Sequence, residues 1–424
     1  GTTNHWAGFC RPLSPIDFEP RDHLAVSGWP IGLADLEPHM TRAAELARIS
    51  GPDFSLATWE EKIGLPPLDL GSDAIETFVY QTTFATKFGF LYGDDLRAAS
   101  DVEVLLHASV VNLATGDGRH IDRVDVRTLD GVQIEATATA YVLATGGIEN
   151  ARLLLASTDA DPAGVGNGND LVGRHFTEHL QVYAGFAILD ADPSLPGFNG
   201  AEVPIEVGRH AGHEHGVKYA LGLTDDHVRD TETTGLEIQM VTSDFPLAAP
   251  LHRDGVTTHD VDALLRREGE APAVAAYLQG LAEQELDPES RVLLGSDTDA
   301  LGMRRVQLDW RYSQADRRRI LDGFRVAAET IGASGLGRVQ LVPGGVHADA
   351  VDFPIGMGFH HMCTTRMATD PAEGVVDADC RMHEVDNLWV GGSSVFATGG
   401  VATPTYTIVA LAIRLAAHLK AVLR

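Results

Sequence analysis

Two adjacent histidines in the last fifth of the chain are the strongest candidates for acid–base chemistry. His360 and His361 lie in the stretch GFHHMCTTRM, which runs from Gly358 to Met367. A histidine with a near-neutral pKa can take the proton of an alcohol while hydride leaves the carbon. Because neighbouring residues of an extended segment point to opposite faces, at most one of the two faces a given pocket. A core or surface histidine with no role in catalysis is the alternative.

A second candidate feature is the start of the C-terminal helix. Thr403 and Pro404 precede a long apolar stretch, and they fit an N-cap and a first helical position. The positive end of a buried helix stabilises an anion, so this helix could serve a site that develops negative charge. On residue type alone, a threonine that only caps a core helix is the simpler interpretation.

Small residues at two strand ends point to a bound phosphate. Tyr141-Val-Leu-Ala-Thr-Gly-Gly ends a predicted strand, and a helix is expected directly afterwards, from Ile148. This is the form of a dinucleotide-binding βα unit, in which glycines let the backbone approach a phosphate. Near the N-terminus, small residues surround Trp6 between Gly1 and Cys10, as in a tight loop over a flat ligand. Any buried turn would fit that segment equally well.

Two histidine patterns resemble metal sites. The residues from His175 to His179 fit H-x-x-E-H, which binds zinc when both histidines lie on one face of a helix. A strand-like run follows at once, so no helix is expected there and we predict no metal site. His210, His213 and His215 lie in a glycine-rich, charged stretch that is typical of a solvated loop.

Composition narrows the function classes. The 424 residues carry a formal net charge of −28, so a nucleic-acid backbone or an anionic membrane would repel the protein. Three widely spaced cysteines form neither a disulfide framework nor a zinc knuckle. The most apolar run, 408–423, is interrupted by Arg414, His418 and Lys420, so we expect a buried helix and no membrane span.

The elements that position these residues can be outlined from hydrophobic periodicity. The section 179–346 is expected to form a mixed sheet that carries the substrate. Ser313 is a plausible N-cap for a helix that continues to Gly332, with Asp316 in its first turn. The pattern also predicts helices at 37–48, from 148 and after 404, and strands at 102–106, 124–128, 138–143, 182–189, 218–223, 236–242 and from 388.

Taken in order, five segments resemble the glucose–methanol–choline (GMC) oxidoreductases, and most closely the bacterial branch with pyranose oxidases and glycoside 3-oxidases. They are GTTNHWAG, YVLATGGIENARLLL, NDLVGRHFTEHL, HHMCTTRM and NLWVGGSSVFATGGVATPTYTIVALAIRLA. The likeness extends from Gly1 to Arg424. It implies an α/β fold with a discontinuous Rossmann-like FAD-binding domain (99–178 and 364–424) and a substrate-binding domain (1–98 and 179–363).

The resemblance also implies roles for single residues. His360 matches the catalytic histidine that receives the substrate hydroxyl proton, and Thr403 stands where the family has a second histidine or an asparagine. His5 matches the position at which some pyranose oxidases link covalently to the flavin, and the linkage here stays open. Ala7 replaces a threonine that contacts the flavin in the pyranose oxidases, and the backbone of Val110 is expected to meet the adenine. The implied FAD-binding residues are Thr3, Asn4, His5, Trp6, Ala7, Gly8, Val110, Thr145, Gly146, Gly391, Gly392, Ser393 and Thr405.

The implied activity is oxidation of a sugar or glycoside secondary hydroxyl to a keto-sugar. Hydride would pass to flavin N5, and O2 or a quinone would accept the electrons. The helix that begins near Pro404 would stabilise the negative charge of the reduced flavin. The alternatives are an FAD-dependent dehydrogenase of a non-sugar alcohol with a quinone or protein acceptor, and a flavoprotein or partner-binding subunit without alcohol oxidation.

One motif of the family is missing from the sequence. The first βαβ unit of these enzymes carries G-x-G-x-x-G, and no stretch of this chain has that spacing. We therefore expect a further segment before Gly1 and weak FAD binding by the chain alone. A cytoplasmic location is expected, and the sequence contains no signal for oligomeric state.

Overall fold

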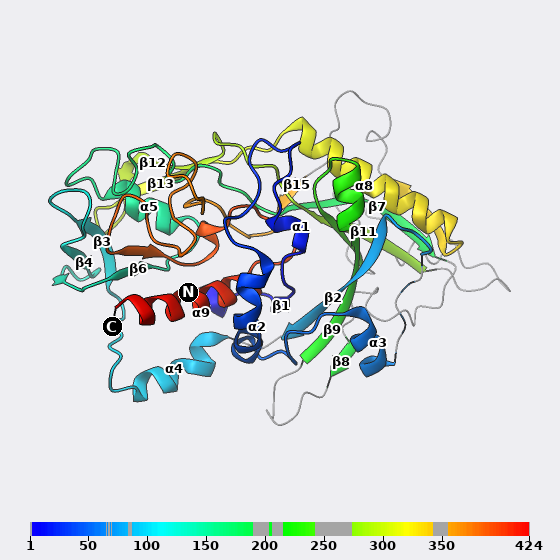
Figure 1. Cartoon of the computed structure of the whole chain (residues 1–424), viewed down its shortest axis with the longest axis horizontal. Helices are drawn as coiled ribbons and strands as arrows, with labels where there is room; N and C mark the ends of the chain where they lie inside the picture. Colours follow the sequence, from blue (N-terminus) through cyan, green and yellow to red (C-terminus); the bar gives the residue numbers. More distant parts are fainter. Residues whose placement is uncertain are drawn as a thin grey trace.

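The computed structural model describes residues 2–64, 66, 68, 70–83, 87–189, 203–205, 215–241, 274–341 and 355–423. Of the three histidines in the predicted solvated loop, His210 and His213 lie outside these residues, and His215 begins a strand. Figure 1 shows a large curved sheet at one end of the molecule and a group of smaller sheets with helices at the other.

The large sheet has nine described strands in the order β1-β2-β9-β10-β11-β7-β14, with β15 paired to β7 and β8 paired to β9. Every described pairing in this sheet is antiparallel. The sequence predicts a mixed sheet, so the expected parallel pairs are absent from the described strands of this sheet. The strands are β1 (Phe9–Cys10), β2 (Ile75–Thr83), β7 (Leu180–Leu189), β8 (Val203–Ile205), β9 (His215–Leu223), β10 (Leu236–Val241), β11 (Val274–Ala282), β14 (Gly337–Leu341) and β15 (Ile355–Met357).

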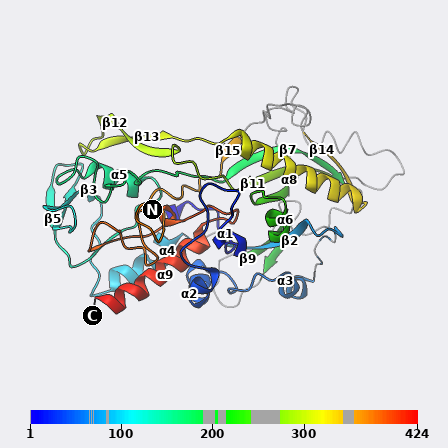
Figure 2. The same cartoon turned by 45° about the horizontal axis from the view of Figure 1, so that its top comes forward.

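Helix α8 (Gln314–Ala333) lies along this sheet, as Figure 2 shows from a second direction. The predicted start of the helix is confirmed. The Ser313 hydroxyl accepts the Asp316 backbone N–H at 3.0 Å, and the Asp316 carboxylate accepts the Ser313 N–H at 2.6 Å, which satisfies two free backbone donors. Phe324 and its apolar neighbours on α8 pack with residues such as Leu221 and Leu278 into one hydrophobic core.

The other end of the molecule contains three small sheets. β6 (Tyr141–Leu143) pairs in parallel with β16 (Leu388–Val390), and α5 (Glu149–Ala156) follows β6 directly. The predicted strand–turn–helix unit is therefore present, although its strand is shorter than the pattern indicates. The remaining elements here are β3 (Ser109–Ala114), β4 (Arg123–Arg127), β5 (Gln133–Ala136), β12 (Arg291–Thr298), β13 (Arg304–Asp309), η1 (Thr2–Asn4) and η2 (Ser393–Val395).

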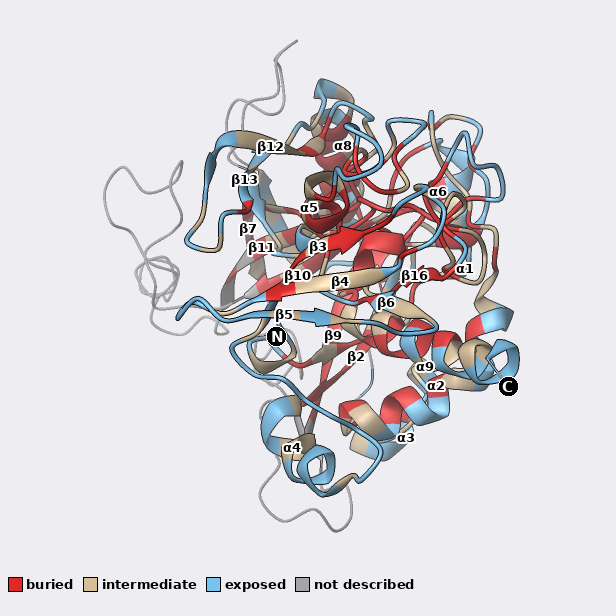
Figure 3. Cartoon of the chain, turned by 90° about the vertical axis from the view of Figure 1, so that its left-hand side faces the viewer, coloured by how far each residue is buried: buried red, intermediate tan, exposed pale blue. Residues whose placement is uncertain are grey.

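A second hydrophobic core forms where α9 (Thr405–Val422) crosses α2 (Leu33–Ala47). The Tyr406 hydroxyl donates to the Met40 carbonyl at 2.9 Å and fixes this crossing. The buried residues of α9 all fall between Tyr406 and Leu415, so the expected burial holds only for its N-terminal part. Figure 3 shows the buried residues gathered around α5 and β16 and the exposed ones on α4 and β5.

Among the described residues, α9 is the one helix long and apolar enough to cross a membrane by length and composition, a test that core helices of soluble proteins also pass. The other helices are α1 (Pro15–Phe18), α3 (Leu56–Ile63), α4 (Phe88–Ala98) and α6 (Asp225–Asp230).

One predicted strand is wrong. Residues 102–106 are irregular, and Val102, Val104, Leu105 and Leu106 are all exposed. The β-branched composition indicated a strand, yet none of the described pairings includes this segment, and a strand is not stable without a partner.

Candidate active site

A cleft with a volume of about 440 Å³ brings together most of the residues singled out in the sequence. It lies between the N-terminal segment, the turn after β6, the His360 segment and the start of α9. The predicted residues that line it are Thr3, His5, Trp6, Ala7, Gly8, Gly146, His360, Ser393, Thr403 and Thr405. Five short segments from distant parts of the chain therefore meet at one cavity.

The other predicted residues lie outside the lining. Gly391 and Gly392 follow β16, and Thr145 precedes Gly146 at the end of β6, so these three are next to the cleft in sequence. The Asn4 amide oxygen accepts the Gly89 backbone N–H at 2.9 Å. Val110 is half-buried on β3, away from the cleft lining. The structure thus separates the expected adenine contact from the residues around His360.

Asn150, at the start of α5, ties the ends of β6 and β16 together. Its fully buried amide accepts the Thr145 backbone N–H at 2.8 Å and donates to the Gly391 carbonyl at 3.0 Å. The same amide nitrogen donates to the Ser394 hydroxyl at 2.8 Å. A single side chain therefore fixes the two glycine-bearing turns that follow the parallel strands.

The segment that carries His360 is held by backbone hydrogen bonds on both sides. The Met362 N–H donates to the Thr177 carbonyl at 3.1 Å, and the Cys363 N–H donates to the Ser393 carbonyl at 3.1 Å. Phe359 and Cys363 have φ angles of 59° and 70°, in the left-handed region that non-glycine residues rarely adopt. Such strained residues cluster at functional sites, where the surrounding contacts hold them in place.

His360 has the electrostatic environment of a neutral base. Burial lowers its pKa to about 3, with smaller contributions from the neighbouring His179 and His361. Its Nδ1 lies 2.9 Å from Nδ1 of His179, which is fully buried. The uncharged form of His360 therefore predominates at neutral pH, and a neutral imidazole can accept a proton.

Glu178 is the second polar group under the His360 segment. Its fully buried carboxylate accepts the His360 backbone N–H at 2.8 Å, and its other oxygen lies 3.1 Å from Nε2 of His361. Burial raises the pKa of Glu178 to about 7, although the backbone hydrogen bonds act in the opposite direction. The two adjacent histidines thus have different partners: His361 pairs with Glu178, and His360 with His179. Both of them line the cleft, so the prediction that at most one faces a given pocket is wrong.

The predicted role of Thr403 as helix cap is wrong. The helix begins at Thr405 after Pro404, and no side chain caps it. The Thr403 hydroxyl donates to the Phe9 carbonyl at 2.9 Å, so its single proton is already used. Thr403 still lines the cleft beside His360, where its oxygen can only accept a hydrogen bond.

The zinc-type pattern does not form a zinc-type geometry. Residues 176–179 contain no helix, and Thr177 instead forms an antiparallel bridge with Met362. Within the described ranges, no group of three or more His, Cys, Asp or Glu side chains is arranged to hold a metal ion. A zinc site of this type requires a helix at this place, and the structure has none there.

Glu178 and His179 are the functional residues that the sequence interpretation missed. The signal is present in the sequence, because both residues belong to the pattern at 175–179 and to the family-like segment NDLVGRHFTEHL, but neither pattern predicts a place for them beside His360. On an extended segment, the same residues lie next to His360 and His361.

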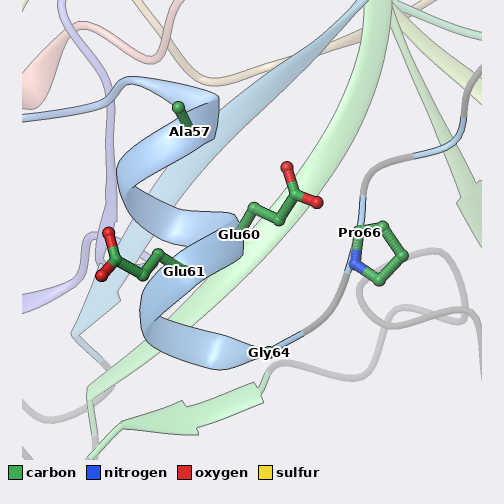
Figure 4. A pocket seen from close by; sticks show the side chains of 5 residues that line it. All are labelled: Ala57, Glu60, Glu61, Gly64 and Pro66. Atoms are coloured by element: carbon green, nitrogen blue, oxygen red, sulfur yellow. The ribbon is translucent and has the colours of Figure 1, made fainter.

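A second hollow, at the C-terminal end of α3, lacks comparable chemistry. Figure 4 shows that the carboxylates of Glu60 and Glu61 point in different directions there, beside Gly64 and Pro66. Among the described residues that line it there is no histidine and no buried polar group, so we place the site in the cleft that contains His360.

The carboxyl ends of β6 and β16 fit a dinucleotide cofactor. Gly146 and Gly392 follow these parallel strands with φ angles of 98° and 94°, and a Cβ atom added at either would meet no atom within 4 Å. Open space therefore lies beside both turns, where glycine lets a backbone approach a phosphate group. The N-terminal end of α9, at Pro404 and Thr405, also faces the cleft and favours negative charge there.

Comparison with known proteins agrees with this geometry. Residues 287–412 match the GMC oxidoreductase family. A 6'''-hydroxyparomomycin C oxidase from Streptomyces lividus is 30% identical over 99% of this chain and 79% of its own length. The chain belongs to the GMC oxidoreductase family. It is an FAD-binding oxidoreductase that acts on CH–OH groups.

Other relatives match with lower identity or over a smaller part of the chain. A 2-methyl-1,2-propanediol dehydrogenase from Mycolicibacterium austroafricanum is 24% identical over 98% of this chain and 79% of its own length. A C-glycoside 3-oxidase from Arthrobacter globiformis is 33% identical, over 34% of this chain and 27% of its own length. The Aspergillus oryzae formate oxidase has the same fold, with a TM-score of 0.55 and 13% identity over 99% of this chain and 83% of that one.

Proposed function

We propose that this GMC oxidoreductase oxidises a secondary hydroxyl of a sugar or glycoside to a keto-sugar, with His360 as the base. The observation that carries the proposal is an uncharged imidazole in the same cleft as the strand-end turns that fit the cofactor. The name of the C-glycoside 3-oxidase supports a glycoside substrate, whereas the name of the propanediol dehydrogenase supports a smaller alcohol.

In the proposed reaction, His360 accepts the proton of the substrate hydroxyl. FAD, when bound, supplies the hydride acceptor, at flavin N5. The alcohol thus loses one proton and one hydride and becomes a carbonyl group. His360 must hold its free ring nitrogen toward the hydroxyl during this step. The backbone hydrogen bonds of Met362 and Cys363 keep the His360 segment in place for this purpose. Thr403 can accept a hydrogen bond from the substrate but cannot donate one, so we assign it a minor part.

Phe359 supports a cyclic substrate. Its side chain is 76% exposed although it lines the cleft directly before His360 in the chain. Ligand sites are mostly lined by apolar and aromatic side chains, with a few polar groups that fix the orientation. An exposed aromatic ring beside a base offers a flat surface for the C–H face of a pyranose, while a small diol would leave most of that ring uncovered.

The proposal is tested by anaerobic titration of the flavin-loaded protein with glucose, an aryl glycoside and 2-methyl-1,2-propanediol, following the flavin absorbance. Bleaching by glucose or the glycoside, with slower or no bleaching by the diol, is the expected result. Bleaching by the diol alone would replace the sugar with a small alcohol. Flavin that no alcohol bleaches would favour the flavoprotein or partner-binding subunit. Admission of air afterwards identifies the acceptor, since only an oxidase is reoxidised quickly by O2.

A further inference from the structure

The ring of His179 lies behind the ring of His360 and contacts it through nitrogen. Its position is just before β7, and its side chain has no exposed surface. The two ring centroids are 4.9 Å apart with an interplanar angle of 80°, and the two Nδ1 atoms are 2.9 Å apart. The other ring nitrogen of His179, Nε2, lies 3.3 Å from the carbonyl oxygen of Gly399.

These two contacts determine where the ring protons lie. A carbonyl oxygen only accepts hydrogen bonds, so Nε2 of His179 must carry the proton that faces Gly399. Burial lowers the pKa of His179, so the ring is neutral and its Nδ1 has a lone pair and no proton. The short contact between the two rings then requires a proton on Nδ1 of His360. The opposite arrangement would place a lone pair of His179 against the Gly399 carbonyl and leave that buried nitrogen unsatisfied.

From this chain of contacts we infer that His179 is a positioning residue that fixes His360 as its Nδ1–H tautomer and keeps Nε2 free to accept a proton. Among the described residues, Nε2 of His360 has no hydrogen-bond partner. The inference rests on the proposed function only in naming that free nitrogen as the base. The tautomer itself follows from contacts of this chain alone.

Glu178 and His179 act on His360 at two different points. Glu178 holds its backbone N–H at 2.8 Å, and His179 holds its ring. Two anchors fix both the position of the residue and the rotation of its side chain. The pairing resembles in principle a catalytic triad, where a third group holds the histidine in the correct tautomer and a wrong tautomer costs about 10⁴-fold in rate.

The direct test is the ¹⁵N chemical shifts of the ring nitrogens in protein labelled at histidine, measured at neutral pH. The His360 signals are assigned by their loss in His360→Gln. We expect a protonated Nδ1 and an unprotonated Nε2. An unprotonated Nδ1 would overturn the inference, even if His360 proved essential for activity. This measurement needs neither bound flavin nor a variant at position 179.

Three variants extend the test. His179→Asn keeps an amide oxygen that can accept from Nδ1 of His360, whereas His179→Leu removes the acceptor. His175→Leu is the matched control, because His175 is a buried histidine of the same segment whose Nδ1 has no hydrogen-bond partner among the described residues. The Leu variant at 179 should lose the wild-type His360 tautomer signal, and the other two should retain it.

Flavin reduction separates this inference from the proposed function. His179→Leu should reduce the rate constant about 10²-fold or more, and His179→Asn should recover much of that loss. If the wild-type tautomer is as expected but His360→Gln reduces flavin normally, the assignment of the base is wrong and the positioning contact stands. An unchanged tautomer and rate in His179→Leu would overturn the role of His179.

Discussion

At the scale of single residues, the site depends on an imidazole that stays uncharged. His360 has its pKa lowered to about 3, chiefly by burial, so loss of the base through protonation requires strongly acidic solution. A base with so low a pKa is always available but weak, since proton transfer is most efficient when the pKa lies near the working pH. The contribution of His360 therefore relies on placement: the proton must leave while hydride departs from the same carbon.

Replacing His360 should cost most of the reductive rate. We expect His360→Gln to lower the rate constant for flavin reduction by about 10²–10⁴-fold, the usual effect of removing a general base. Stopped-flow absorbance under anaerobic conditions measures it. The neighbouring His361→Gln is the control and should lose less than about 10-fold, because His361 contacts Glu178 rather than His179. Equal losses in both variants would contradict the assignment.

Glu178 should make stability depend on pH. Its pKa is raised from 4.5 to about 7, so the folded protein holds this proton more tightly than the unfolded chain. The resulting stabilisation is complete below about pH 4.5 and is lost as the pH rises toward about 7. From pH 5 to pH 8, the free energy of unfolding of the wild type, measured with urea, should fall by on the order of 3 kcal/mol relative to that of Glu178→Gln. A constant difference between the two proteins would exclude the raised pKa.

At the scale of elements, what could be predicted from the sequence was local. The βα unit at β6 and α5 and the capped start of α8 each depend on signals within a few residues, and the structure has them. The pattern GFHHMCTTRM, together with the family resemblance, likewise predicts the role of His360 from neighbouring residues. Local signals could not predict the contact of His179 with His360, because 181 positions separate the two residues. The bridge from Thr177 to Met362 brings them together in the fold. The β-branched composition at 102–106 also predicts a strand that the structure does not have.

The turn after β6 offers a test of the cofactor site at this scale. Gly146→Ala should weaken FAD binding by at least about 10-fold, because the added methyl group occupies space beside the strand end. Gly131→Ala is matched in backbone, since its φ is 91° and it also has open space, but it lies in the turn between β4 and β5. Both should lose about 1–2 kcal/mol of stability from left-handed strain. Isothermal titration with FAD distinguishes the two variants. Equal affinities of Gly146→Ala and Gly131→Ala for FAD would show that the turn after β6 is not part of the cofactor site.

At the scale of the whole molecule, the cleft keeps its shape only if the N-terminal segment stays fixed in position relative to the large sheet. The N-terminal residues line the cleft, while His179 precedes β7 of the sheet. A buried ion pair joins the two parts. Arg21 donates from both terminal nitrogens to Glu283, at 2.7 and 2.5 Å, and both side chains are almost fully buried. Glu283 directly follows β11, and its backbone N–H donates to the Gly235 carbonyl at 3.0 Å.

Breaking this pair should cost more than removing it. Arg21→Met leaves Glu283 as an uncompensated buried charge and should destabilise the protein by about 3–5 kcal/mol, as should Glu283→Met for the opposite reason. In Arg21→Met/Glu283→Met neither charge remains, so the double variant should be more stable than either single one. Chemical unfolding of the wild type, the two single variants and the double variant measures the free energies of this double-mutant cycle. A double variant as unstable as the sum of the singles would mean that the residues do not act as a pair, and the N-terminal segment would then be held by its other contacts, such as the pairing of β1 with β2.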